Sequence, residues 1–197
     1  MVSSAGGNEE RGNLRAATLR RIVTGRDAQG RSIVVSDGPA VRQVQLDSAP
    51  GVCLAELWRT EATHALECAG VDPTVAQTSF VPGPGETLFR VFEEPSGDVD
   101  ALPDGTSLDR FFAEAAERIP GLAETLERDV LGMHTTESVD YIVVLRGNGA
   151  LELDDDVRVP IGPGDCIVQN GTRHRWHNLG QEPLVAIAVM VGSRRQR

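Results

Sequence analysis

Three of the four histidines of this chain lie in two short blocks near its C-terminal end. His134 precedes Asp140 in the first block, and His174 and His177 stand close together in the second. Histidine is the commonest metal ligand in proteins and the side chain that most readily transfers protons near neutral pH. Their clustering around a carboxylate predicts one chemical site that is assembled from two strands.

Short strands separated by turns must position these two blocks. Strand-like segments recur at short intervals between residues 133 and 191, and we expect strands at 138–145, 150–153, 157–161, 166–169 and 184–191. The acidic run 154–156 is expected to be a solvated hairpin turn. Regular spacing of this kind predicts a sandwich or barrel of antiparallel strands.

Strand patterns also fill much of the N-terminal half. They predict strands at 20–24, 31–36, 41–46, 52–60 and 87–93. Between residues 60 and 85 the pattern is irregular and interrupted by proline, which predicts a long loop. The polar, glycine-rich start predicts a flexible tail over 1–17, followed by one domain over 18–193 with a motif-bearing core at 132–191.

One helical region lies between the two sets of strands. The residues Thr106 to Asp109 can cap a helix, and the apolar residues that follow recur at helical spacing as far as Ile119. Pro120 ends this helix and can begin a second one, in which Leu122, Leu126 and Val130 would face inward. We expect this helical pair to cover one side of the fold.

Composition excludes several classes of function. The chain of 197 residues has a net charge of −10, which argues against nucleic-acid binding because phosphate binding needs a basic face. All 19 basic residues are arginine, so lysine-based catalysis is excluded. No apolar run is long enough to cross a membrane, and three cysteines without a CxxC spacing predict no disulfide framework. We expect a cytoplasmic protein without membrane or nucleic-acid partners and without a nucleotide or flavin cofactor.

The first block has the spacing of a known motif. It reads His134-x-Thr136, three residues, Asp140, six residues, Gly147. This resembles the first motif of the cupin superfamily, which contains His-x-His, a Glu three or four residues later, and a Gly six residues beyond it. The chain departs from that motif at its second histidine and at its glutamate.

The second block has the spacing of the second cupin motif. It reads Gln169-x-Gly171, two residues, His174, three residues, Asn178. The family has Pro-x-Gly, two residues, His, three residues, Asn, so the chain departs at the proline. The resemblance covers residues 132–191. It implies an all-β fold, the cupin-type antiparallel double-stranded β-helix or jelly-roll barrel, with an N-terminal strand extension and a helical insertion near 106–130.

The resemblance also implies a homodimer and a metal site. Cupins typically bind metal through the two histidines and the glutamate of the first motif and the histidine of the second. The matching positions here are His134, Thr136, Asp140 and His174, so one nitrogen ligand is missing. The remaining two histidines and one carboxylate would leave coordination positions open on a divalent metal such as Fe, Zn, Mn or Ni.

Strand alternation places further residues at the expected pocket. Thr136 shares a face with His134 and lies beside the ligands. Trp176 shares a face with His174 and is either a pocket wall or core filling, whereas His177 is expected to point outward to the surface. The other expected pocket residues are Gln169, Asn178, Trp58 and Phe92.

Each candidate ligand also has a purely structural interpretation. His134 and His174 could be satisfied polar groups of the core, and Asp140 could pair with Arg173 or Arg175. Three hypotheses of function follow. The first is a metal-assisted cupin enzyme that acts on a small organic molecule by lyase, isomerase, cyclase or oxygenase chemistry. The second is a metal-free acid–base dehydratase or isomerase, and the third is a non-catalytic module that binds a small ligand.

Overall fold

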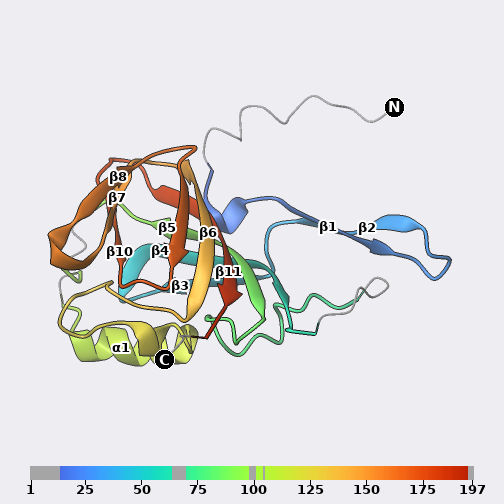
Figure 1. Ribbon diagram of the computed structural model, residues 1–197, viewed down its shortest axis with the longest axis horizontal. Helices are drawn as coiled ribbons and strands as arrows, with labels where there is room; N and C mark the ends of the chain where they lie inside the picture. Colours follow the sequence, from blue (N-terminus) through green and yellow to red (C-terminus); the bar gives the residue numbers. More distant parts are fainter. Residues whose placement is uncertain (1–13, 64–69, 98–100, 104, 195–197) are drawn as a thin grey trace.

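Antiparallel strands make up most of the protein (Figure 1). The computed structural model describes residues 14–63, 70–97, 101–103 and 105–194. Its strands are β1 (Arg21–Arg26), β2 (Ser32–Gly38), β3 (Arg42–Leu46), β4 (Ala49–Thr60), β5 (Thr87–Glu94), β6 (Ser138–Arg146), β7 (Gly149–Glu152), β8 (Arg158–Ile161), β9 (Cys166–Asn170), β10 (Arg175–Asn178) and β11 (Leu184–Gly192). The strands predicted from the sequence are all present, with shifted ends.

Two sheets form the body of the fold. A large sheet has the strand order β3-β4-β5-β11-β6-β9, and a small sheet has the order β10-β7-β8. All paired strands are antiparallel. The predicted all-β, double-stranded β-helix is therefore confirmed.

One hydrophobic core fills the space between these two sheets. The large sheet contributes Leu54, Phe92 and Ile142, and the small sheet contributes Leu151 and Trp176. In the strand register, residues on the interior face of the large sheet alternate with residues that point to its outer face. Side chains on the interior face can therefore meet the histidines of the two motifs.

The helix α1 (Leu108–Arg118) lies against one end of the barrel, near β3 (Figure 1). Ser107 caps it by accepting a hydrogen bond from the backbone N–H of Arg110, and Phe111 and Ala115 enter the core. At the β3–β4 turn, the Glu114 carboxylate accepts hydrogen bonds from two backbone N–H groups. The first predicted helix is therefore confirmed.

The second predicted helix is wrong. Residues 120–130 contain only a 3-10 turn, η3 (Ala123–Thr125). Gly121 has a φ of +84°, and Leu126 is extended and pairs with His134 in an isolated β-bridge. The apolar spacing that predicted a helix reflects burial of an irregular segment, which continues directly into the first motif.

The N-terminal strands form an arm outside the barrel. β1 and β2 pair with each other in a two-stranded sheet that projects from the body (Figure 1). Most of the predicted tail lies outside the described residues, but residues 14–17 pack against the large sheet. Ala16 is buried there and lies in the 3-10 turn η2 (Ala16–Thr18), and its N–H donates to Glu93. The expectation of a tail as far as residue 17 is corrected accordingly.

The segment between β4 and β5 is irregular where it is described, as predicted, and it folds back over the barrel. The N–H of Phe80 donates to the carbonyl of Pro120, and the Phe80 ring lies in the core. The acidic run forms a 3-10 turn, η4 (Asp154–Asp156), between β7 and β8. None of the described helices is long and apolar enough to cross a membrane.

Candidate functional site

The two sequence motifs meet at His134 and His174. The backbones of these residues exchange two hydrogen bonds, each of 3.0 Å between N and O. Side chains of such a directly opposed antiparallel pair lie on the same side. Their ring centroids are 4.2 Å apart, and the ring planes are inclined by 50°. The imidazoles therefore form a contacting pair.

Each imidazole uses its Nδ1 atom in the same way. His134 Nδ1 lies 3.0 Å from the carbonyl oxygen of Gly132, and His174 Nδ1 lies 2.9 Å from that of Thr172. A carbonyl oxygen only accepts hydrogen bonds, so Nδ1 carries the proton in both rings. In the neutral form the lone pair is then on Nε2, which is the atom free to act as a base or a ligand.

Burial keeps both imidazoles uncharged. Desolvation lowers the pKa of His134, and the positive charge of Arg90 lowers it further, while Glu127 acts in the opposite direction. Desolvation, followed by the proximity of His134, lowers the pKa of His174 to about 3. Both rings are therefore neutral at pH 7.

Aromatic side chains continue from the histidine pair into the core. The ring of His174 contacts Trp176 edge-on at 5.5 Å, and Trp176 lies 5.4 Å from Phe92 between ring centroids. Both aromatic residues are at least nine-tenths buried. Trp176 and Phe92 thus form an apolar wall beside His174.

Asp140 shares the interior face with the histidines but makes no ion pair with either of them within the described part of the chain. Its Oδ1 atom is buried without a hydrogen-bond partner among those residues. Burial raises the pKa of Asp140, and Ser138 and the Arg90 charge only partly oppose this. The alternative of simple pairing with arginine is wrong, because Arg173 and Arg175 bind other carboxylates.

Those arginines flank His174 on both sides. Arg173 donates to both carboxylate oxygens of Glu127, at 2.7 and 2.8 Å, and also contacts Asp154. Arg175 donates to Glu152 at 2.9 Å. The Arg173–Glu127 pair fastens the segment before the first motif to the second motif, so it helps to hold His134 against His174.

The donor set tests whether a metal fits the predicted ligands. In residues 14–63, 70–97, 101–103 and 105–194, no three His, Cys, Asp or Glu side chains come close enough together to hold a metal ion. Two imidazole nitrogens are suitably prepared, but Asp140 does not join them as the third ligand. The arrangement in this structure does not fit the predicted three-ligand centre.

Two further pocket candidates share the interior face, but part of their hydrogen-bonding capacity is already used by neighbouring residues. Thr136 is buried, and its Oγ1 accepts a hydrogen bond of 2.9 Å from Ser138. Gln169 lies opposite Asp140 in the register, and its amide donates to the backbone and the hydroxyl of Thr172. Both residues shape the neighbourhood of Asp140.

Trp58 and Asn178 are not brought to this cluster. A β-bulge after Glu56 places Trp58 opposite Phe89, on the outer face of the large sheet. The side chain of Asn178 stabilises a turn, where it donates hydrogen bonds to the carbonyls of Glu94 and Glu182 and accepts one from the N–H of Gly180. Alternation alone could not reveal the bulge, which reverses the side of the sheet that Trp58 occupies.

His177 is also placed differently from the prediction. It does point away from Trp176, but it is only 6% exposed, and its Nε2 lies 2.6 Å from Glu152. Arg175 lies on the same face and reaches the carbonyl of Leu131. The outer face of β10 is thus covered, so the expectation of a surface histidine is wrong.

A row of charged side chains lies inside the barrel and was not predicted from the sequence. Arg42, Glu56 and Arg90 are opposite one another on β3, β4 and β5, on the same face as Phe92. An ion pair of 2.8 Å joins Arg90 to Glu56. The β5 pattern alternates apolar and polar residues, but both of its faces are buried, so it gave no sign that Arg90 points inward.

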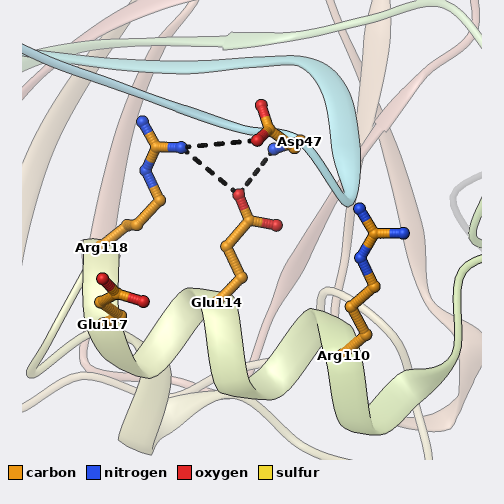
Figure 2. Close-up of a pocket in the computed structure, with 5 residues that line it drawn as sticks. All are labelled: Asp47, Arg110, Glu114, Glu117 and Arg118. Atoms are coloured by element: carbon orange, nitrogen blue, oxygen red, sulfur yellow. Dashed lines mark hydrogen bonds and ion pairs between the residues drawn. The ribbon is translucent and has the colours of Figure 1, made fainter.

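A charged hollow lies on the outside of the barrel, between α1 and the β3–β4 turn (Figure 2). Its volume is about 320 Å³, and it is lined by Asp47, Arg110, Glu114, Glu117 and Arg118. Arg118 lies 3.5 Å from Glu114 and 3.9 Å from Asp47. These mutual contacts fasten the helix to the sheet, so we assign this hollow a structural role.

The fold and the paired motifs define a family. The profile of the cupin domain matches residues 127–190. The chain belongs to the cupin superfamily, which its two motifs predict. Phomopsin biosynthesis cluster proteins C' and D of Diaporthe leptostromiformis are each 31% identical to it over 182 residues, which are 87% of this chain and 75% of each relative.

Solved structures with similar architecture are much more distant in sequence. The cupin domain of Schizosaccharomyces pombe Cnp3 is 10% identical, with a TM-score of 0.45 over 88% of both chains. A predicted oxalate decarboxylase from Thermotoga maritima is 16% identical, with a TM-score of 0.38 over 90% of this chain and 96% of that one. These similarities carry nothing about chemistry.

Proposed function

We propose that this protein is an enzyme that moves protons on a small organic molecule inside the barrel. Isomerisation, cyclisation and dehydration are the reactions that such chemistry serves. The observation that carries the proposal is the paired arrangement of His134 and His174. Both Nδ1–H groups donate to backbone carbonyls, so both rings are oriented and both Nε2 atoms remain available as bases.

The two imidazoles have different surroundings, which suggests different roles. His134 is half-buried, and although burial lowers its pKa, the hydrogen bond to the Gly132 carbonyl and the charge of Glu127 partly oppose this. His174 is 2% exposed, and its pKa of about 3 disfavours protonation. We therefore assign the acceptor of the substrate proton to His134, and a hydrogen-bonding and positioning role to His174.

The relatives suggest where such an enzyme would act. Two of them are named as proteins of a phomopsin biosynthesis cluster. We propose that this chain, too, takes part in the biosynthesis of a small molecule. The compartment, the homodimer and the absence of a nucleotide or flavin cofactor stay predictions.

A metal-assisted reaction at the same histidines is the second candidate. Metal-bound histidines commonly donate their other ring N–H to a carbonyl or carboxylate, and both histidines here do so. The missing third ligand argues for the metal-free reaction. Metal analysis of untagged protein separates the two candidates, because a metal site predicts near-stoichiometric metal that is lost in His134→Ala.

Solvent-deuterium exchange tests the proposed function directly. The wild-type protein in D2O should incorporate deuterium into members of a panel of small carbonyl compounds, with and without a carboxylate, that have an acidic C–H bond, read by mass spectrometry. His134→Gln should slow this exchange by about 100-fold or more, the usual contribution of a general base. His177→Gln, which removes an imidazole from the other face of β10, is the matched control and should retain exchange per folded molecule.

Each other outcome favours a different function. Exchange that stops on chelation and returns with added metal would support the metal-assisted enzyme. Binding of panel members without any exchange or turnover would support the non-catalytic ligand-binding module and contradict our proposal. Exchange that is equally fast in His134→Gln would remove His134 from the reaction.

A further inference from the structure

The charged row inside the barrel, Arg42–Glu56–Arg90, is the strongest unexplained feature of the molecule. Cross-strand register places these side chains in line on the interior face of the large sheet. Glu56 is 0% exposed and Arg90 is 4% exposed. Charges are seldom buried this deeply unless they are paired or serve a ligand.

The row is not electrically balanced. One carboxylate, Glu56, stands between two guanidinium groups, and it forms its ion pair with Arg90. Both guanidiniums also lie over the ring of Phe80, with their Cζ atoms 5.0 Å (Arg42) and 5.6 Å (Arg90) from its centroid. An aromatic face stabilises a cation but does not neutralise it. Arg42, which is only partly buried, therefore has no carboxylate of its own among the residues that the structure describes.

The row also has hydrogen-bonding capacity left over. Among the described residues, the buried Nε–H groups of Arg42 and Arg90 have no hydrogen-bond acceptor, and the buried Oε1 atoms of Gln77 and Glu56 have no hydrogen-bond donor, although Glu56 Oε1 lies 2.8 Å from Arg90 in the ion pair. Gln77 is 3% exposed and reaches the row through its other amide atom, which donates to Glu56. Buried polar atoms are nearly always paired in folded proteins, so several in one place indicate an absent partner.

A structural role in holding the segment between β4 and β5 does not explain why these Nε–H groups and this amide oxygen are unpaired. Arg90 already holds that segment by donating to the carbonyl of Phe80 at 2.7 Å, and Gln77 holds it through Glu56. Those contacts use other atoms of the same side chains. These contacts therefore leave the Nε–H groups and the amide oxygen unexplained.

This row belongs to the same interior as the histidine pair. The Arg90 charge acts on both His134 and Asp140, and all lie on strands or bridges that face the core. Asp140 supplies another buried oxygen without a donor. A ligand that extends from the histidines to the row could accept hydrogen bonds from the Nε–H groups of Arg42 and Arg90 and donate to the Oε1 atom of Gln77.

We propose that Arg42 and Arg90 form a carboxylate-binding subsite, with Gln77 accepting from an N–H or O–H group of the same molecule. The substrate would then be a small carboxylic acid with a hydrogen-bond donor near its carboxylate, such as an N-acylated amino acid. This deepens the proposed function, on which it rests for the location of the substrate. Guanidinium Nε–H groups bind carboxylates through charge-assisted hydrogen bonds, which are stronger than neutral ones.

Three matched small molecules probe the subsite in the full chain. N-acetylglycine has both groups, N-acetylglycinamide lacks the carboxylate charge, and acetoxyacetate replaces the N–H with an ester oxygen. NMR titration of the wild-type protein should give a Kd for N-acetylglycine about tenfold or more below that of the amide, and below that of acetoxyacetate. Equal affinity for acid and amide would overturn the proposal.

The variant Arg42→Gln assigns that preference to the row. It should reduce the acid-over-amide ratio to about threefold or less, whereas Arg20→Gln, which removes an exposed arginine paired with Asp37 on the N-terminal arm, should leave the ratio unchanged. If Arg42→Gln does not fold by circular dichroism, Arg42→Met keeps an unbranched side chain of similar reach without the charge, and the same reduction is expected. A folded variant that retains the full preference refutes the subsite.

Binding and catalysis fail separately in this design. The titrations measure no turnover, so a refuted subsite leaves the deuterium-exchange test of His134 untouched. Conversely, an acid preference that depends on Arg42 in a protein without exchange activity would contradict the proposed enzyme and still support the subsite.

Discussion

Two buried charge clusters in this molecule contain the same kinds of residue and differ in how completely they are paired. On the outer face of the small sheet, Glu152 receives hydrogen bonds from Arg158, Arg175 and His177, at 2.8, 2.9 and 2.6 Å. Inside the barrel, the carboxylate of Glu56 stands between Arg42 and Arg90 in the strand register and forms an ion pair with Arg90. We call these the outer cluster and the inner cluster.

The difference separates structure from function. Every carboxylate oxygen of Glu152 has a donor, as expected of a cluster that only has to hold the sheet together. The inner cluster leaves buried Nε–H groups and an amide oxygen without partners among the described residues. Since an unpaired buried polar atom destabilises the fold by about 1–3 kcal/mol, its retention suggests that a ligand completes the pairing.

The largest expected effect comes from breaking the outer cluster. Glu152→Gln leaves the buried guanidinium of Arg175 and the imidazole of His177 without their carboxylate, and we expect it to lower the free energy of unfolding by about 3–5 kcal/mol. Urea denaturation at pH 7 measures this. The control Glu182→Gln removes a carboxylate that is 65% exposed and paired with Arg146, and should cost less than about 1 kcal/mol.

The acid side of the stability profile gives a second measurement on the same residue. Burial raises the pKa of Glu152, but the hydrogen bonds from Arg175 and His177 outweigh it, so the pKa lies below its ordinary value of 4.5. The stability that Glu152 contributes is present above pH 4.5 and is lost as the pH falls through its lowered pKa. A Glu152→Gln variant with an unchanged profile would show that the outer cluster is not structural.

The two clusters also show what could be predicted from the sequence. Alternation and motif spacing brought His134 and His174 together and put Asp140 on their face, because those strands alternate regularly. These patterns did not reveal that Arg90 and Glu56 point inward. Both faces of β4 and β5 are buried, so the sequence does not distinguish a buried arginine on these strands from an exposed one. Long-range partners such as the Glu152–His177 pair depend on tertiary packing, which no local pattern encodes.

Local backbone detail accounts for the remaining errors. The bulge after Glu56 moved Trp58 to the outer face, and the positive φ of Gly121 ended the helical path that the spacing of Leu122 and Leu126 suggested. Both depend on one residue's conformation. The pairing of the first motif with the segment at Leu126 then replaced the second helix by an extended strand-like contact.

A smaller effect is expected at a carboxylate on the interior face that forms no ion pair with any described residue. Glu94 follows Phe92 on that face of β5, and burial, followed by the charge of Glu93, raises its pKa from 4.5 to about 7. A raised carboxyl pKa destabilises the folded protein as the group ionises. The penalty is absent below pH 4.5, grows between pH 4.5 and 7, and is complete above pH 7.

The isosteric variant Glu94→Gln removes that ionisation. At pH 8 it should be more stable than the wild type by about 2–3 kcal/mol, and at pH 4 the two proteins should be equally stable. Thermal unfolding across this pH range measures the difference. A constant difference at every pH would mean that Glu94 is solvated or paired like the residues of the outer cluster.

The smallest effect concerns Asp140. It tests whether the unpaired buried polar atoms of the inner cluster continue as far as the carboxylate beside the histidine pair. Its buried Oδ1 has no partner among the described residues, so the neutral isostere Asp140→Asn should leave stability unchanged or raise it by on the order of 1 kcal/mol at pH 8. Denaturation measures that change, and deuterium exchange in the same variant should fall. Unchanged or higher stability together with slower exchange is expected of a residue that destabilises the fold but serves the reaction. Substitution of a structural carboxylate such as Glu152 should instead lower stability and leave exchange per folded molecule unchanged. Loss of stability in Asp140→Asn with normal exchange would place Asp140 with the structural carboxylates.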